Sequence, residues 1–243
     1  MRDTVFRFAN FFYEHWFSLY RVAYFSYKRV GDRERIDRIK KVVKPGMTVV
    51  DIGANIGFYT VLLSRIVGVK GRVYSFEPDP LNFKRLQAVT RGLENVVLER
   101  SAVASNSGQL MLFRSGKYNV DHRTYDCQES REAITVSSWA LDDYFPEATK
   151  IDFIKMDVQG FEFQALSGMK KIVQASERLV LLSEFWPYGL HLAGVRPSSY
   201  LELIRDFGLT VEESGNKALT QFDDKINDPT FYVDFFATRN ICS

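Results

Sequence analysis

The chain has 243 residues, of which 46% are apolar and 26% are charged, a balance typical of globular proteins. A chain of this length buries enough surface to fold without a disulfide or a structural metal. Its formal net charge is only +2, whereas nucleic-acid-binding proteins concentrate basic residues on one surface. We therefore expect no nucleic-acid partner. Cys127 and Cys242 form neither a CxxC pair nor a metal-type cluster and are expected to be ordinary thiols.

The amino-terminal region is rich in aromatic residues. Eleven of the chain's 35 Phe, Tyr and Trp residues lie between Phe6 and Tyr27. Charged residues divide this stretch into runs far shorter than the roughly 20 apolar residues of a membrane span, and the pattern is not that of a signal peptide. We expect a cytoplasmic protein. Apolar spacings of three and four residues predict a helix over 4–28, with Phe8, Phe11, Phe12, Trp16, Leu19 and Ala23 on one stripe. A second helix is predicted over 32–43, capped by Asp32.

A basic segment follows the aromatic helix. Residues 28–44 include eight basic and three acidic side chains. Two interpretations fit this pattern: the helix packs on the sheet or on a second subunit in a homodimer, or it makes a peripheral contact with an anionic membrane. We divide the chain into a helical extension, 1–44, and a main domain, 45–243.

Strand and helix patterns alternate from Met47 onward. Strands are predicted over 48–52, 72–76, 96–99, 110–113, 134–137, 151–156, 179–184, 210–213 and 232–238. Helices are predicted over 58–67, 81–91, 161–174 and 200–207, and a polar loop over 115–131. This alternation predicts an α/β fold with a doubly wound, mostly parallel, Rossmann-like sheet. The last strand follows another strand directly and is predicted to be antiparallel.

The turn after the first predicted strand has the features of a ligand site. It contains two glycines, Gly53 and Gly57, but their spacing is not the GxGxxG of dinucleotide-binding proteins. A cofactor without phosphates suits this turn better. Glu77 ends the second strand, 24 residues after Gly53, where a carboxylate is placed to accept both hydroxyls of a ribose.

Three motifs in order resemble the FkbM family of methyltransferases. They are the run from Val50 to Thr60 with its DIGANIG turn, then Phe76-Glu77-Pro78, and then the run from Ile154 to Glu162. The resemblance covers about residues 44–185. It implies a class I methyltransferase fold of seven strands, S-adenosylmethionine as methyl donor, and O-methylation of a sugar, glycolipid or polyketide. Gln159 stands where the family more often has Glu.

The resemblance also assigns roles to matching positions. Asp51 is expected to orient the turn and face the amino group of the methionine part, which Gly53, Ala54 and Asn55 would line, with Gly57 completing the turn. Glu77 would hold the ribose, and Pro78 with its neighbour Asp79 would approach the adenine. Ala102 lies after the third strand, where such enzymes grip the adenine ring. Asp157 would lie beside the sulfonium.

A hydroxyl acceptor must lose a proton, so we expect a base at the carboxyl end of the fourth or fifth strand. The candidates are Asp157, Glu184, Glu162 and His122. Each has a structural alternative: Asp157 and Glu162 can stabilise a helix N-terminus, Glu184 can close the sheet edge, and His122 can be a solvated loop residue. His191 is a further candidate for the acceptor pocket. Asp157 and Glu184 together are also compatible with Mg²⁺, although the sequence shows no other metal site.

The sequence therefore predicts an S-adenosylmethionine-dependent O-methyltransferase acting on a small-molecule, glycan or glycolipid acceptor. The alternative is a module that binds S-adenosylmethionine without turnover and acts through a partner held at the aromatic amino terminus. A nucleic-acid methyltransferase is disfavoured by the charge balance and by the lack of an Asn-Pro-Pro-Tyr type motif.

Overall fold

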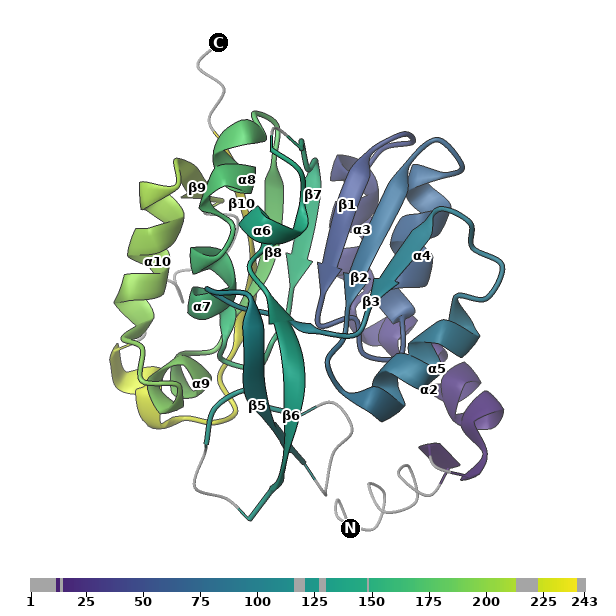
Figure 1. Ribbon diagram of the computed structural model, residues 1–243, viewed down its shortest axis with the longest axis horizontal. Coiled ribbons are helices and arrows are strands. Elements are labelled where there is room, and N and C mark those ends of the chain that lie inside the picture. The colour runs from purple at the N-terminus through teal and green to yellow at the C-terminus, as the bar shows by residue number, and fades with distance from the viewer. Residues whose placement is uncertain are drawn as a thin grey trace.

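In the computed structural model, the chain folds into a central seven-stranded sheet flanked by helices. The structure describes residues 12–13, 15–115, 121–126, 130–147, 149–212 and 223–239. The strand order is β3-β2-β1-β7-β8-β10-β9 (Figure 1). Its members are β1 (Thr48–Ile52), β2 (Arg72–Phe76), β3 (Val96–Glu99), β7 (Phe153–Met156), β8 (Val180–Phe185), β9 (Leu209–Val211) and β10 (Val233–Arg239). Strand β10 pairs antiparallel with β8 and β9, whereas the other pairs are parallel. The predicted fold class is confirmed.

Helices cover both faces of this sheet because its central strands are apolar on both sides. On one face, Val50, Ile154 and Leu181 share a core with α6 (Leu141–Tyr144), α7 (Glu162–Ser167), α8 (Lys170–Ala175), α9 (Pro187–Leu192) and α10 (Pro197–Asp206). On the other face, Val49 and Phe153 pack against α3 (Arg33–Val42) and α4 (Phe58–Val67). Helix α5 (Pro80–Val89) lies beside α4, where a side chain at Gly57 would meet Leu86.

The residues between β3 and β7 in sequence form a second sheet. It has the order β4-β6-β5, with β4 (Ala102–Val103), β5 (Gly108–Arg114) and β6 (Glu132–Trp139). The antiparallel pair β5–β6 extends past the carboxyl ends of the parallel strands (Figure 1). Both strands are longer than predicted, because each is solvated on one side and the polar residues at their ends still join the ladder.

Three local predictions need correction. The helix predicted over 161–174 is two helices, α7 and α8, separated at Gly168 and Met169. Gly168 lies so close to the chain that a Cβ there would be 2.0 Å from the carbonyl oxygen of Ala104. Helix α9, which begins at Pro187, and the short strand β4 were not predicted.

The amino-terminal helices make different contacts with the sheet. Ile36, Ile39 and Val43 of the α3 region are buried in the core beside α4. Helix α2 (Phe17–Gly31) has no fully buried residue, although Phe25 makes an edge contact with Phe58 at a centroid distance of 5.2 Å. Asp32 stands at the N-cap of α3, but its side chain does not cap the helix. The division at residue 44 remains a prediction.

None of the described helices is long and apolar enough to cross a bilayer. Cys127, Cys242, residues 116–120 and 127–129 of the predicted polar loop, and the helical residues predicted before Phe12 lie outside the described residues.

Candidate active site

A cavity of about 590 Å³ opens at the carboxyl ends of the parallel strands. This is the edge at which open α/β sheets bind ligands, and the volume is in the range of small-molecule sites. Its wall comes from the ends of β1, β2, β7 and β8, from the β5–β6 hairpin and from α2 and α3. The lining includes Gly53, Asn55, Glu77, Pro78, Ala102, His122, Asp157 and Glu184. The structure therefore brings eight of the predicted site residues to one cavity.

The turn after β1 is fixed by backbone contacts with its neighbours. The amides of Gly53 and Ala54 both donate to the carbonyl oxygen of Phe76 at 3.0 Å. Gly53 has φ +73°, and a Cβ there would lie 2.1 Å from the carbonyl oxygen of Asp157. Glycine is therefore required by the packing of the turn against β7, and not only by the approach of a ligand. Ala54 and Gly57 do not line the cavity; Gly57 is left-handed at φ +91° and starts α4.

Glu77 is held in place by the turn that it faces. Its Oε2 accepts from the amide of Asn55 at 2.8 Å, and its Oε1 accepts from the amide of Asp79 at 2.9 Å. The Asn82 side chain also hydrogen-bonds to it. A carboxylate has about four acceptor positions, so capacity remains for a ligand hydroxyl. Burial raises the pKa of Glu77 to about 7, although these hydrogen bonds act to lower it.

Two of the three residues expected near the adenine line the cavity, and the third does not. Pro78 and Ala102 line the cavity, but Asp79 does not. The Asp79 carboxylate caps α5 by accepting from the amides of Leu81 and Asn82, and its other oxygen accepts from Arg114 Nε at 2.8 Å. Asp79 is therefore occupied as a helix cap.

His122 lies at the same end of the cavity, beside Asp79. Its Nδ1 accepts from the amide of Ser115 at 3.1 Å, and its Nε2 is 3.9 Å from Asp79 Oδ2. Burial holds the pKa of His122 below its usual value, although Asp79 opposes this. His122 thus lies beside the residues that follow β2, whereas Asp157 follows β7. The role of His122 as a base remains a prediction.

Asp157 and Glu184 form a carboxyl pair at the tips of β7 and β8. The amide Nε2 of Gln159 is 2.9 Å from Asp157 Oδ1 and 3.4 Å from Glu184 Oε2. Burial would raise the pKa of Asp157, but Lys155, Gln159, Lys28 and Arg35 outweigh it and hold that pKa below its usual range. Burial, followed by the charges of Asp157 and Glu162, raises the pKa of Glu184 well above its usual range. The pair thus combines an ionised carboxylate with a carboxyl that holds its proton more tightly.

Lys155 supplies a buried cation that the sequence reasoning did not assign a role. Its Nζ donates to the carbonyl oxygen of Gly53 at 3.0 Å and lies 3.4 Å from Asp51 Oδ1. Asp51 is fully buried, accepts from the Thr60 hydroxyl at 2.7 Å, and does not line the cavity. Asp51 therefore holds the glycine turn from the protein interior and does not face the cavity. Alternation along β7 was the available signal, because it places Lys155 and Asp157 on the same face.

Glu162 and His191 are not at the cavity wall. Glu162 is fully buried on the first turn of α7, and its Oε1 accepts from the amide of Val158 at 3.0 Å. Burial raises its pKa to about 7. This geometry matches the helix-terminus alternative for Glu162. His191 is exposed on α9 and does not line the cavity.

The amino-terminal helices contribute a polar network to the cavity that sequence reasoning missed. The Tyr59 hydroxyl donates to Asp32 Oδ2 at 2.6 Å and accepts from Arg35 Nη1 at 3.0 Å. Lys28 pairs with Asp32, and Arg35 also pairs with Asp234 of β10. Lys28, Asp32 and Arg35 all line the cavity. Their separation in sequence from the glycine turn hid this proximity.

The described residues give no support to a divalent cation. Asp157 and Glu184 are brought together, but within the described ranges no group of three or more His, Cys, Asp or Glu side chains is placed to hold a metal ion.

The chain is similar in sequence to known methyltransferases. The model of the methyltransferase FkbM domain matches residues 51–204. The hexuronic acid methyltransferase AglP of Haloferax volcanii is 27% identical over 166 residues, which are 67% of this chain and 63% of that protein. The chain thus spans a little under two thirds of this relative. The ribosomal RNA large subunit methyltransferase E of Bdellovibrio bacteriovorus is 34% identical over 76 residues, or 31% of this chain and 39% of that one.

Among solved structures, a SAM-dependent methyltransferase from Aquifex aeolicus superposes with a TM-score of 0.49 at 19% identity, over 87% of this chain and 92% of that one. The family match covers more than half of the chain, including the glycine turn, Glu77 and the carboxyl pair. The chain belongs to the FkbM family of S-adenosylmethionine-dependent methyltransferases.

Proposed function

We propose that this protein transfers the methyl group of S-adenosylmethionine to a hydroxyl of a sugar, glycolipid or polyketide-type small molecule. The observation that carries the proposal is the carboxyl pair Asp157 and Glu184, which shares one cavity with Glu77. Bound S-adenosylmethionine supplies a methyl group activated by its positively charged sulfur. The residues around it must bind the donor, orient the acceptor and receive a proton.

The cavity has groups suited to each part of the methyl donor. Glu77 offers acceptor capacity for the ribose hydroxyls, with Pro78 and Ala102 nearby for the adenine. The Lys28 and Arg35 cations suit the carboxylate of the methionine part, and Asp157 suits a positive charge. A Cβ at Gly53 would collide with the chain, so the narrow turn between Glu77 and Asp157 depends on glycine.

Glu184 is our choice for the group that takes the acceptor proton. A general base must accept a proton more readily than an ordinary carboxylate does, and burial, followed by the charges of Asp157 and Glu162, raises the pKa of Glu184 well above its usual range. Asp157 has a lowered pKa and is a weaker base, but its ionised form favours the sulfonium. Gln159 positions both carboxyl groups.

A sugar acceptor has two sources of support. The Haloferax volcanii relative is named for a hexuronic acid, which is a hydroxylated sugar acid. The Trp186 side chain, two residues after Glu184, lines the cavity, and aromatic rings provide flat apolar surfaces for sugar faces.

The test is methyl transfer from labelled S-adenosylmethionine to a panel of hexuronic acids, neutral sugars, glycolipids and hydroxylated polyketides. We expect label in an O-methyl group of at least one acceptor. Glu184→Gln should lower turnover by roughly 10²–10⁴-fold, the usual contribution of a general base. Binding of S-adenosylhomocysteine should change little, which controls for folding.

Two results would overturn parts of the proposal. Full turnover in Glu184→Gln together with a large loss in Asp157→Asn would transfer the role of base to Asp157. S-adenosylmethionine binding with no labelled product from any hydroxyl acceptor would favour the alternative, a binding module that acts through a partner at the amino terminus.

A further inference from the structure

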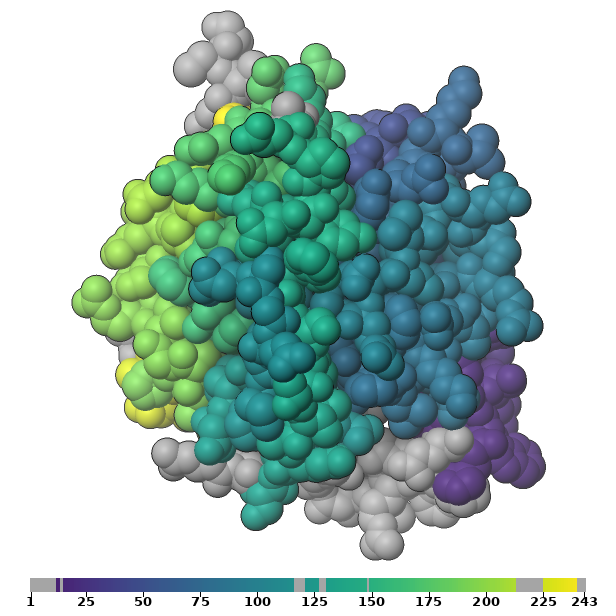
Figure 2. Space-filling view, viewed as in Figure 1, coloured from purple at the N-terminus to yellow at the C-terminus, as the bar shows by residue number. Residues whose placement is uncertain are grey.

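Helix α2 exposes an apolar face to solvent. Of the eight large apolar side chains exposed among the described residues, five belong to α2 or its N-cap: Trp16, Leu19, Val22, Tyr27 and Val30. Trp16 is 61% exposed and Val30 is 80% exposed. Their spacing places them along one side of the helix. The predicted stripe that includes Trp16, Leu19 and Ala23 is therefore the solvent face, whereas Tyr13 is buried. Figure 2 shows α2 at the surface of the molecule, in purple at the lower right.

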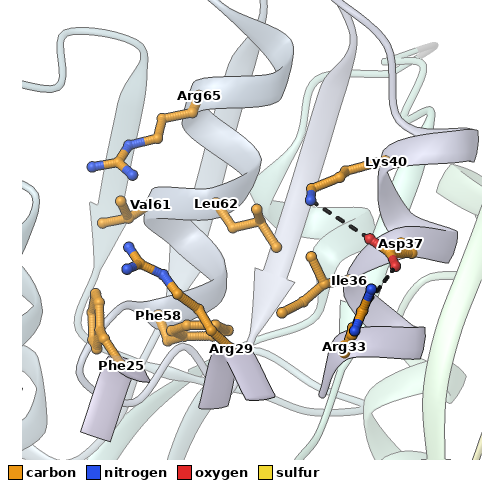
Figure 3. A pocket seen from close by; sticks show the side chains of 10 residues that line it. All are labelled: Phe25, Arg29, Arg33, Ile36, Asp37, Lys40, Phe58, Val61, Leu62 and Arg65. Atoms are coloured by element: carbon orange, nitrogen blue, oxygen red, sulfur yellow. Dashed lines mark ion pairs between the residues drawn. The ribbon is translucent and has the colours of Figure 1, made fainter. Parts of the chain in front are cut away.

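A basic groove of about 340 Å³ lies along one flank of this face, between α2, α3 and α4 (Figure 3). Its floor is apolar, with Phe25, Ile36, Phe58, Val61 and Leu62. Four basic side chains and one acidic side chain line it: Arg29, Arg33, Lys40, Arg65 and Asp37. Arg29 and Arg65 lie on one side of Ile36 and Leu62, and Arg33 and Lys40 lie on the other (Figure 3).

The charge of this groove is only partly balanced within the protein. Arg33 and Lys40 both pair with Asp37, at 4.0 Å and 3.6 Å. Arg29 and Arg65 make no ion pair within the part of the chain that the structure describes. Two arginines beside an apolar floor suit an anionic group that carries an apolar portion.

We propose that the exposed face of α2 and the basic groove together form a docking surface for an anionic lipid bilayer. The apolar side chains enter the headgroup–acyl boundary, and the groove arginines bind lipid phosphate or carboxylate groups. An apolar helix face flanked by cations is the pattern of an interfacial helix.

A second copy of the chain fits the same surface less well. A two-fold interface is self-complementary, so an interface centred here would bring two basic grooves together. Like charges in contact disfavour such an interface. A bilayer with anionic headgroups instead complements the charge and covers the apolar face.

The docking surface also borders the candidate active site. Tyr27, which is 72% exposed on α2, lines the cofactor cavity as well. A bilayer in contact with α2 would therefore lie next to the mouth of that cavity. This position favours an acceptor attached to a lipid, an inference that rests on the proposed function. The docking of the protein on a bilayer does not depend on that function.

The experiment is sedimentation of the full chain with vesicles of phosphatidylcholine, alone or with about 30% phosphatidylserine, at low and high salt. We expect binding only to the anionic vesicles and weaker binding at high salt. Arg29→Glu combined with Arg65→Glu should reduce partitioning ~25-fold or more, since each basic side chain contributes roughly a fivefold change. The matched control is Lys70→Glu with Arg91→Glu. It makes the same change in charge at exposed sites outside the groove and should bind more tightly than the groove variant.

Tryptophan emission provides an independent readout. Anionic vesicles should shift the emission to shorter wavelength as Trp16 leaves water, and Trp16→Phe should abolish most of the shift. S-adenosylhomocysteine binding should persist in every variant, which separates failure of this proposal from failure of the proposed function. The docking surface is refuted if the full chain ignores anionic vesicles at low salt, or if the groove and control pairs bind equally. Light scattering that shows a dimer disrupted by Leu19→Glu would instead assign the face to a second copy.

Discussion

The side-chain amide of Gln159 donates to Asp157 Oδ1 at 2.9 Å, and the same nitrogen lies 3.4 Å from Glu184 Oε2. One donor thus serves two carboxyl groups whose pKa values are shifted in opposite directions. Gln159 has φ +55°, an uncommon conformation for a residue other than glycine. Gln159 is therefore the residue that links the two acids.

Gln159→Glu should move the acid limb of the pH–rate profile upward by roughly 0.5–1 unit. The variant places a third carboxyl beside Asp157 and Glu184, and like charges disfavour ionisation. Gln159→Leu is the matched control, because it removes the donor without adding a charge. The profile is measured with an acceptor from the panel described above. Equal shifts in the two variants would show that the lost hydrogen bond, and not the added charge, controls the titration.

Binding of S-adenosylhomocysteine should strengthen as pH rises through about 7. Glu77 has a pKa of about 7 in the free protein, and ribose hydroxyls donate to its ionised form. Below that pH, binding must therefore release a proton, and the affinity falls. Calorimetry at pH 6 in two buffers of different ionisation enthalpy measures the release.

Glu77→Gln should remove this proton release and weaken binding by about 1.5–3 kcal/mol, the usual value of a hydrogen bond to a charged group. Glu99→Gln, at the end of the neighbouring strand and outside the cavity lining, is the control. Unchanged affinity in Glu77→Gln would place the ribose contact elsewhere.

Glu162→Gln should stabilise the protein more at pH 8 than at pH 5. The folded-state pKa of Glu162 is raised to about 7, so its contribution to stability is full below the usual carboxyl pKa and is lost as pH rises toward 7. A shift of this size corresponds to roughly 3 kcal/mol at most. Gln keeps an acceptor for the Val158 amide but cannot ionise. The measurement is Tm at both pH values, with Glu202→Gln on the exposed side of α10 as control. A gain that is the same at both pH values would contradict the assignment.

Gly53→Ala should be far more destabilising than Gly68→Ala. Both glycines have positive φ, +73° and +65°, so an alanine backbone is strained at either position. A Cβ at Gly53 would also lie 2.1 Å from the Asp157 carbonyl oxygen, whereas nothing lies within 4 Å of one at Gly68. Urea denaturation should show at least ~2 kcal/mol between the two variants. Equal midpoints would show that the turn can relax around the new methyl group.

The sequence alone determined the elements around the first turn. Strands β1, β2 and β3 and helix α4 have the predicted bounds, because uninterrupted apolar runs and glycines are local signals. The same signals located Gly53, Asn55, Glu77, Asp157 and Glu184, all of which reach the cavity. Their roles in binding and catalysis remain predictions.

Tertiary structure alone decided which polar residues face the cavity and which are buried behind its wall. Asp51 and Glu162 belong to the predicted motifs, yet both are buried and bonded to the protein, while Lys28, Asp32 and Arg35 reach the cavity from the amino-terminal helices. Period and spacing give the face of an element on which a residue lies. The partner of that face depends on packing between segments far apart in sequence, as with Arg35 and Asp234, 199 residues apart. For the same reason, the sequence showed an aromatic helix, but only the packing of α2 on α4 fixed which of its sides remains exposed.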